Sequence, residues 1–303
     1  MIYTVTFNPA LDYVMNVNEL QTKDINRTES EALYYGGKGI NVSVILSRLG
    51  FENKALGFIA GFTGRYIEEM LKKDNIKTDF IYLENGYTRI NVKIRAEQEY
   101  DINAQGPEIS QADIFALYER LDELKAGDCI VLAGSVPKTL PNDIYENILK
   151  RLENKGVDFV VDATGDLLLN VLKFKPFMIK PNHLELGELF SVEIKTLEDI
   201  KIYGKKLQEM GAKNVLLSRG KHGAALLDEN GVLHKMGNVP GKIKNTVGCG
   251  DSMVAGFLAG YFETKDYDYA LRLGSACGNA TAFCETLATR AEINEMLLSE
   301  YLK

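Results

Sequence analysis

The sequence predicts an α/β protein, in which a mostly parallel sheet carries helices on both faces and a small antiparallel sheet projects from it. From residue 129 onward, short apolar runs alternate with segments of helical periodicity, as in βαβ units. Residues 88–95 instead alternate apolar and polar side chains, which is typical of an antiparallel strand with one face in water. The length of 303 residues suits one large α/β core with an appended part.

The predicted core strands are short apolar runs separated by helical segments. Residues 129–133 are apolar throughout, as expected of a strand buried on both faces. Helices are predicted over 141–155, with Pro141 in the first turn, and over 196–210, with Thr196 as the N-cap. Further strands are predicted at 157–161, 177–179 and 214–217. Right-handed connections between such strands produce a mostly parallel sheet.

The first hundred residues predict a second, smaller sheet. Residues 12–33 have little helical periodicity and many β-forming and turn residues. Within residues 88–95, one face is apolar (Ile90, Val92, Ile94) and the other is polar (Asn91, Lys93, Arg95). We expect these segments to form a small sheet that serves as a lid, as a dimer surface, or as both.

The net charge of −7 argues against a general nucleic-acid-binding protein, because such a protein needs a basic face. The longest apolar run, 253–262, is far shorter than the roughly 20 residues that span a bilayer, and the N-terminus lacks the features of a secretion signal. We therefore expect no nucleic-acid or membrane partner. Any attraction for an anionic ligand has to be local.

Other classes are excluded by motifs that the sequence lacks. The four cysteines show no C-x-x-C spacing, which favours free thiols in a reducing cytoplasm. The three histidines form no zinc-binding pattern, and the sequence has no P-loop, G-x-G-x-x-G or G-x-S-x-G motif. The chemistry therefore has to use carboxylates, backbone amides, or both.

Residues 245–256 predict an anion site. Gly248 and Gly250 precede Asp251, which opens an almost wholly apolar helix. Glycines let a ligand approach the free amides at a helix N-terminus, where the helix dipole favours negative charge. A carboxylate at this place can act as a base on a hydroxyl that faces a phosphate. The alternative is that Asp251 only caps the helix.

Three further segments carry polar residues next to glycine or proline. In residues 36–43, Lys38 lies among glycines and Asn41 follows in the first turn of a helix; a surface loop is the alternative. Asn182 and Glu185 lie three residues apart at a helix start, where they can hold hydrated Mg²⁺ through its waters or form a capping box. Residues 218–223 follow a predicted strand and contain two glycines, Gly220 and Gly223, spaced to wrap a small ligand; a simple turn is the alternative.

In this order, the motifs resemble those of the PfkB branch of the ribokinase-like sugar kinases. The resemblance covers essentially the whole chain and includes residues 6–12 (TFNPALD), 36–41 (GGKGIN) and 245–256 (NTVGCGDSMVAG). It implies a ribokinase-like three-layer α/β/α core and a discontinuous β lid. The implied core comprises residues 1–10, 35–86 and 107–303, and the implied lid comprises residues 11–34 and 87–106.

The resemblance also implies roles for individual residues. Asp251 matches the catalytic base, and its anion hole is Gly248, Cys249 and Gly250. The implied sugar-phosphate-binding residues are Asp12, Gly37, Lys38, Asn41, Arg89, Ser135 and Lys138. Arg89 and Lys138 are expected to grip the phosphate of the substrate. ATP is expected against Lys180, Asn182, Ser218, Gly220, Gly223 and Asn279, with Mg²⁺ near Glu185.

Within the family, residues 88–93 and 101–107 are most similar to the branch that phosphorylates fructose 1-phosphate. This similarity implies ATP- and Mg²⁺-dependent transfer to the 6-hydroxyl, giving fructose 1,6-bisphosphate, by a cytoplasmic homodimer joined through the lid. Two alternatives stay open: a tagatose-6-phosphate kinase, and a catalytically silent sugar-phosphate sensor on the same fold.

Overall fold

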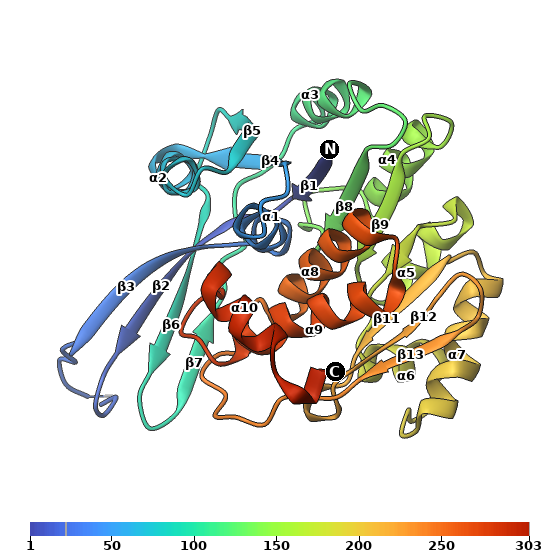
Figure 1. Cartoon of the computed structure of the whole chain (residues 1–303). Helices are drawn as coiled ribbons and strands as arrows, with labels where there is room; N and C mark the ends of the chain where they lie inside the picture. The colour runs from blue at the N-terminus through green and yellow to red at the C-terminus, as the bar shows by residue number, and fades with distance from the viewer. Residues whose placement is uncertain (22, 303) are drawn as a thin grey trace.

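The computed structural model describes residues 1–21 and 23–302 and has the predicted α/β fold, with a large and a small sheet (Figure 1). Within those residues, no helix combines the length and the apolar character needed to cross a bilayer. The elements, in chain order, are β1 (Ile2–Thr6), β2 (Ala10–Asn16), β3 (Ser30–Gly36), α1 (Lys38–Arg48), β4 (Asn53–Ala60), α2 (Gly61–Lys73), β5 (Lys77–Leu83), β6 (Arg89–Arg95), β7 (Glu99–Ile102), α3 (Gln111–Asp122), β8 (Cys129–Ala133), α4 (Ile144–Leu152), β9 (Asp158–Asp162), α5 (Gly165–Val171), η1 (Leu172–Phe174), β10 (Met178–Ile179), α6 (His183–Phe190), α7 (Leu197–Glu209), β11 (Asn214–Ser218), η2 (Gly220–His222), β12 (Ala224–Leu227), β13 (Leu233–Met236), α8 (Cys249–Thr264), α9 (Tyr267–Ala282), α10 (Arg290–Leu297) and η3 (Glu300–Leu302).

The large sheet has, in the described part of the chain, nine strands in the order β13-β12-β11-β10-β9-β8-β1-β4-β5. The strands from β11 to β5 run parallel, and β12 and β13 add an antiparallel edge. Parallel strands end at the same edge of a sheet, and ligands of open α/β sheets bind beyond that edge. Residues that follow β1, β8, β9 and β10 therefore meet at one place.

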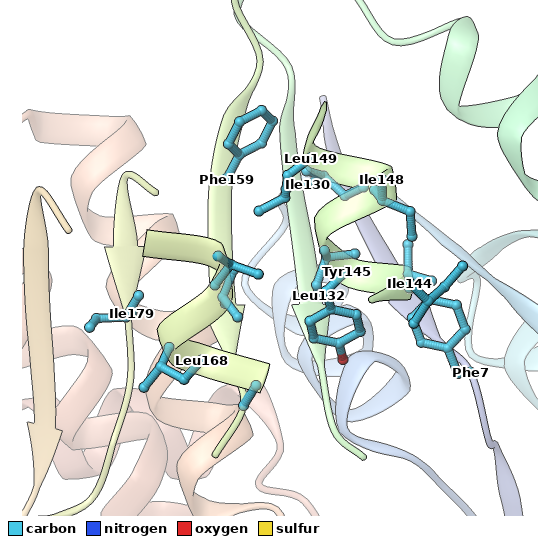
Figure 2. Packing of buried hydrophobic residues seen from close by; sticks show 14 of the residues in the cluster. Phe7, Ile130, Leu132, Ile144, Tyr145, Ile148, Leu149, Phe159, Leu168 and Ile179 are labelled. Carbon is cyan, nitrogen blue, oxygen red and sulfur yellow. The ribbon is translucent and has the colours of Figure 1, made fainter. Parts of the chain in front are cut away.

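Helices cover both faces of the large sheet. Alternate residues of β8 enter different clusters: Ile130 and Leu132 pack with α3 to α7, whereas Cys129 and Val131 pack with α1, α8, α9 and α10. Figure 2 shows the first cluster, where side chains of α4 face β8. Each fully buried Leu or Ile contributes roughly 1.5–3 kcal/mol of stability. Burial on both faces explains why residues 129–133 are apolar without alternation.

The predicted core elements are confirmed, with one difference in length. Thr196 caps α7 through a capping box with Asp199, as its position predicts. The helix predicted over 141–155 is shorter, because α4 spans only Ile144–Leu152. The amide of Ile144 bonds to the carbonyl of Pro141, three residues back, so a separate turn precedes the helix.

The small sheet has the order β3-β2-β6-β7 and projects to one side of the core (Figure 1). Both outer pairs are antiparallel, as expected, whereas the central pair, β2 with β6, is parallel. A parallel pair needs a long crossover, and here the chain passes through α1, β4, α2 and β5 between the two strands. Asp12 pairs with Asn91 and with Tyr34, so these three side chains share one face of the sheet.

Candidate active site

A cavity of about 470 Å³ is lined by the small sheet and by the carboxyl ends of the core strands. Residues far apart in the sequence meet there, as expected beyond the carboxyl edge of a parallel sheet. The predicted site residues that line it are Asp12, Gly37, Lys38, Asn41, Arg89, Ser135, Lys180, Asn182, Glu185, Ser218, Gly248, Gly250 and Asp251.

Five predicted residues are not among those that line this cavity: Cys249, Lys138, Gly220, Gly223 and Asn279. Lys138 is exposed, and the Cys249 thiol lies 3.5 Å from the carbonyl of Asn245. Gly223 packs so closely on β13 that a Cβ would lie 2.1 Å from the carbonyl oxygen of Met236. The Asn279 side chain accepts a bond from the Val239 amide and donates one to the Ser275 carbonyl.

Asp251 is the third residue of α8, and its carboxylate does not cap the helix. The N-cap is Gly248, whose φ of 82° is in the left-handed region that favours glycine. Oδ2 of Asp251 instead accepts a 2.8 Å hydrogen bond from Nδ2 of Asn41, a residue of α1. The alternative in which Asp251 only caps its helix is therefore wrong.

The surroundings of Asp251 disfavour its charged form. The residue is only 5% exposed. Burial and the negative charge of Asp162 raise the pKa of Asp251 to about 6, although the Asn41 hydrogen bond and the charges of two lysines act in the opposite direction. A carboxylate with a pKa near neutrality can accept a proton from a substrate and release it again at physiological pH.

Two lysines lie beside this carboxylate and share one partner. Nζ of Lys38 and Nζ of Lys180 lie 3.2 Å and 3.3 Å from the same oxygen, Oδ1 of Asp162. A Cβ at Gly250 would lie 3.3 Å from Nζ of Lys180, so this ammonium group lies against the first turn of α8. Ammonium groups and a helix N-terminus together attract anions locally, although the protein carries a net negative charge.

Asp162 is a site residue that the sequence analysis missed. It is the last residue of β9, and a carboxylate that follows an apolar run at the carboxyl end of a parallel strand was the available signal. Asn91 and Lys93 were also missed, although their strand was predicted. Asn91 donates a 2.8 Å hydrogen bond to Oδ1 of Asp12, and Nζ of Lys93 lies 3.4 Å from Oδ2.

Arg89 links the small sheet to the segments beside it. Its Nε donates to the carbonyl of Asn8 at 3.2 Å, and its Nη1 donates to the carbonyl of Ala104 at 3.3 Å. These two bonds hold the guanidinium where it lines the cavity. An arginine in this place can bind a phosphate through its remaining N–H groups.

Asn182 and Glu185 form a capping box at the start of α6. Oδ1 of Asn182 accepts from the amides of Leu184 and Glu185, and Oε2 of Glu185 accepts from the Asn182 amide at 2.7 Å. Both side chains also line the cavity. The capping box does not use Oε1 of Glu185, so capping and water-mediated metal binding are compatible. Among residues 1–21 and 23–302, no cluster of three or more His, Cys, Asp or Glu side chains is placed to hold a metal ion directly.

Several known proteins are similar to this chain over nearly its whole length. The 1-phosphofructokinase of Bacillus subtilis is 46% identical over 98% of this chain and 97% of its own length. The D-tagatose-1-phosphate kinase of Bacillus licheniformis is 38% identical over 97% of each chain. A crystal structure of phosphofructokinase-2 from Escherichia coli, in complex with substrates and products, has a TM-score of 0.92 at 25% identity and covers 98% of each chain. A family model described as pfkB family carbohydrate kinase matches residues 5–293, and the chain therefore belongs to the pfkB family of carbohydrate kinases.

Proposed function

We propose that this kinase transfers the γ-phosphoryl group of ATP to the 6-hydroxyl of fructose 1-phosphate, giving fructose 1,6-bisphosphate and ADP. The observation that carries the proposal is the buried carboxylate of Asp251 at the N-terminus of α8, beside the ammonium groups of Lys38 and Lys180. The choice of sugar phosphate is supported by the relative of 46% identity, which is named 1-phosphofructokinase.

In the proposed reaction, Asp251 acts as the general base. Its carboxylate takes the proton of the 6-hydroxyl while the oxygen of that hydroxyl forms a bond to the γ-phosphorus. The bond between this phosphorus and the bridging oxygen breaks, and ADP leaves with the electron pair. The backbone amides of Gly248, Cys249 and Gly250 would bind the charged oxygens of the phosphoryl group during its transfer.

The sugar phosphate would bind between the core and the small sheet. Asp12, held by Asn91 and Lys93, is placed to accept hydrogen bonds from sugar hydroxyls. Gly37, Lys38, Asn41 and Ser135 complete this proposed binding site, and Arg89 and Lys138 would bind the 1-phosphate. We further propose that residues 11–34 and 87–106 act as a lid, which excludes water that would otherwise accept the phosphoryl group.

ATP would bind on the other side of Asp251. The proposed contacts are Lys180, Asn182, Ser218, the turn at Gly220 and Gly223, and Asn279. Mg²⁺, held through its waters near Glu185 and Asn182, would neutralise charge on the phosphates. One or two carboxylates with several retained waters are sufficient for this ion, so the residues present fit it.

We also propose that the protein is a homodimer that works in the cytoplasm. The face of the small sheet opposite Asp12 is apolar: Leu33, Tyr13, Val92 and Ile102 are paired across its strands. Leu33 and Ile102 are exposed, and a second copy of the sheet would cover them. The four cysteines are all free thiols, which suits a reducing compartment.

D-tagatose 1-phosphate is a second candidate substrate, because a relative of 38% identity carries that name. The test is to measure kcat/KM for fructose 1-phosphate, D-tagatose 1-phosphate, tagatose 6-phosphate and fructose 6-phosphate with ATP. We expect the highest value for fructose 1-phosphate. A higher kcat/KM for another sugar phosphate would make that compound the proposed substrate instead. If none of the four sugar phosphates led to ADP formation, the catalytically silent sensor would be favoured.

A further inference from the structure

We infer that Asp162 is a positioning residue for phosphoryl transfer, which holds the ammonium groups of Lys38 and Lys180 beside the cavity and away from the carboxylate of Asp251. This inference rests on the proposed function, since it assigns a role in the same reaction. It adds a residue that does not itself accept the substrate proton.

The two carboxylate oxygens of Asp162 differ in their contacts, and a purely structural role does not explain this difference. Oδ1 faces both lysines, at 3.2 Å and 3.3 Å. Oδ2 is buried and has no hydrogen-bond partner among the described residues, although the side chain lines the cavity. Asp162 is 1% exposed, and a buried carboxylate with an unsatisfied oxygen costs stability. Replacing such a buried ion pair by apolar residues often stabilises a protein, so its presence at a cavity points to function.

The two lysines have a competing partner in Asp251, whose buried carboxylate lies close enough for both of their charges to act on it. An ammonium group paired directly with the base would stabilise its charged form and weaken its pull on a proton. The shared oxygen of Asp162 keeps both ammonium groups engaged elsewhere. It also offsets the repulsion between two positive charges held side by side.

Charged groups from several elements surround the base. The carboxylate of Asp251 is faced by Lys38 from α1, by Lys180 after β10 and by Asp162 from β9. The thiol of Cys249 lies near it on α8, and Glu185 from α6 acts on Lys38. Neutralising Asp162 removes a negative neighbour of the base and frees two positive ones. Both changes favour the charged form of Asp251.

The test compares Asp162→Asn and Asp162→Ala with Asp158→Asn. Asp158 is the half-buried carboxylate at the other end of the same strand, so it controls for loss of a carboxylate in β9. In the Asp162 variants we expect kcat to fall by about 10-fold or more. We expect KM for ATP and for the sugar phosphate to stay equal or fall, because the site loses a negative charge. The acid limb of the pH profile of kcat should move to lower pH. In Asp158→Asn, kcat, KM and the pH profile should match those of the wild type.

Binding of ADP, measured by equilibrium dialysis, gives a readout that needs no turnover, and thermal unfolding shows whether each variant folds. Unchanged or tighter ADP binding in Asp162→Asn supports the inference. Wild-type kcat in both variants overturns it, and so does a raised KM with an unmoved pH profile, which indicates a structural role. Recovery of kcat at high Mg²⁺ also overturns it, because Asp162 would then act through the metal. Failure of the wild type to phosphorylate any sugar phosphate would instead remove the proposed function.

Discussion

Nδ2 of Asn41 donates a 2.8 Å hydrogen bond to Oδ2 of Asp251, a residue 210 positions away in the sequence. This contact joins the first turns of two helices that each follow a glycine N-cap. Asn41 is buried in α1, and Asp251 is buried in α8, so the two helices fix both ends of the bond. The bond orients the carboxylate and stabilises its charge. The second oxygen, Oδ1, is the atom that we propose takes the substrate proton.

Asp251→Asn should therefore bind substrates and barely turn them over. We expect kcat to fall about 10²–10⁴-fold with KM nearly unchanged, because an amide cannot accept the proton. Initial rates of ADP release with saturating substrates measure this. A kcat within threefold of wild type, on the order of 1 kcal/mol or less in barrier height, would remove the base assignment.

The same substitution should make the protein more stable at neutral pH. The pKa of Asp251 is raised to about 6, so the folded state loses stability as the pH rises from about 4 through 6. An asparagine at this position is uncharged at every pH in this range, so the variant does not lose this stability. Thermal unfolding should show a higher Tm for Asp251→Asn than for wild type at pH 7.5, with a smaller difference at pH 4.5. An equal difference at both pH values would contradict the raised pKa.

Asn41→Ala should shift the pH dependence of the reaction. The Asn41 hydrogen bond lowers the pKa of Asp251, so its removal should raise that pKa above about 6. The acid limb of the kcat/KM profile should move to higher pH, and the loss of activity should be larger at pH 6 than at pH 8. Ser43→Ala is the matched control, because Ser43 is buried on the same helix and its hydroxyl lies 2.8 Å from Oγ1 of Thr4. A shift of the same size in both variants would show that α1 packing, rather than the Asn41 bond, is responsible.

Much of this site could be predicted because its motifs are local. Gly248, Gly250 and Asp251 are consecutive or nearly so, and a helix start is a short-range feature of sequence. Asp162 could not be recognised in the same way. A carboxylate after a short apolar run is ordinary, and it becomes part of a site only because β9 lies between β8 and β10 in the sheet. Strand order depends on long-range packing, which local patterns do not contain.

The small sheet illustrates the same limit. Alternation within residues 88–95 predicted the strand and its two faces. It could not predict that β6 pairs in parallel with β2, since that depends on a crossover through the core. Consequently the polar face was expected to lie in water, whereas Asn91 is buried and faces Asp12. Only the pairing register places Asn91 and Lys93 beside the carboxylate of Asp12, which we propose binds the sugar.

His234 should contribute stability that depends on pH. Its Nδ1 lies 2.7 Å from Oδ1 of Asp268, and its Nε2 lies 3.0 Å from Oδ2 of Asp228. Burial opposes the charge of the ring, but the two carboxylates raise the pKa of His234 above its ordinary value of 6.5. The contribution is therefore complete below pH 6.5 and is lost as the pH rises through the higher pKa of the folded state. His234→Gln should lower Tm more at pH 6 than at pH 9. The control is His222→Gln, which changes an exposed histidine and should leave Tm unchanged at both pH values. An equal loss of Tm at pH 6 and at pH 9 in His234→Gln would refute the ion pairs.

Ile102→Asp should separate the proposed dimer. Ile102 is 61% exposed at the edge of the small sheet and pairs with Val92 on the apolar face. A carboxylate there would have to be buried without a partner when two lids meet, which costs several kcal/mol. Phe115→Asp is the matched control, because Phe115 is 63% exposed on α3 of the core. Light scattering should find a dimer for wild type and Phe115→Asp and a monomer for Ile102→Asp. A monomeric wild type would contradict the proposed dimer. A dimeric Ile102→Asp variant would show that the dimer forms through another surface.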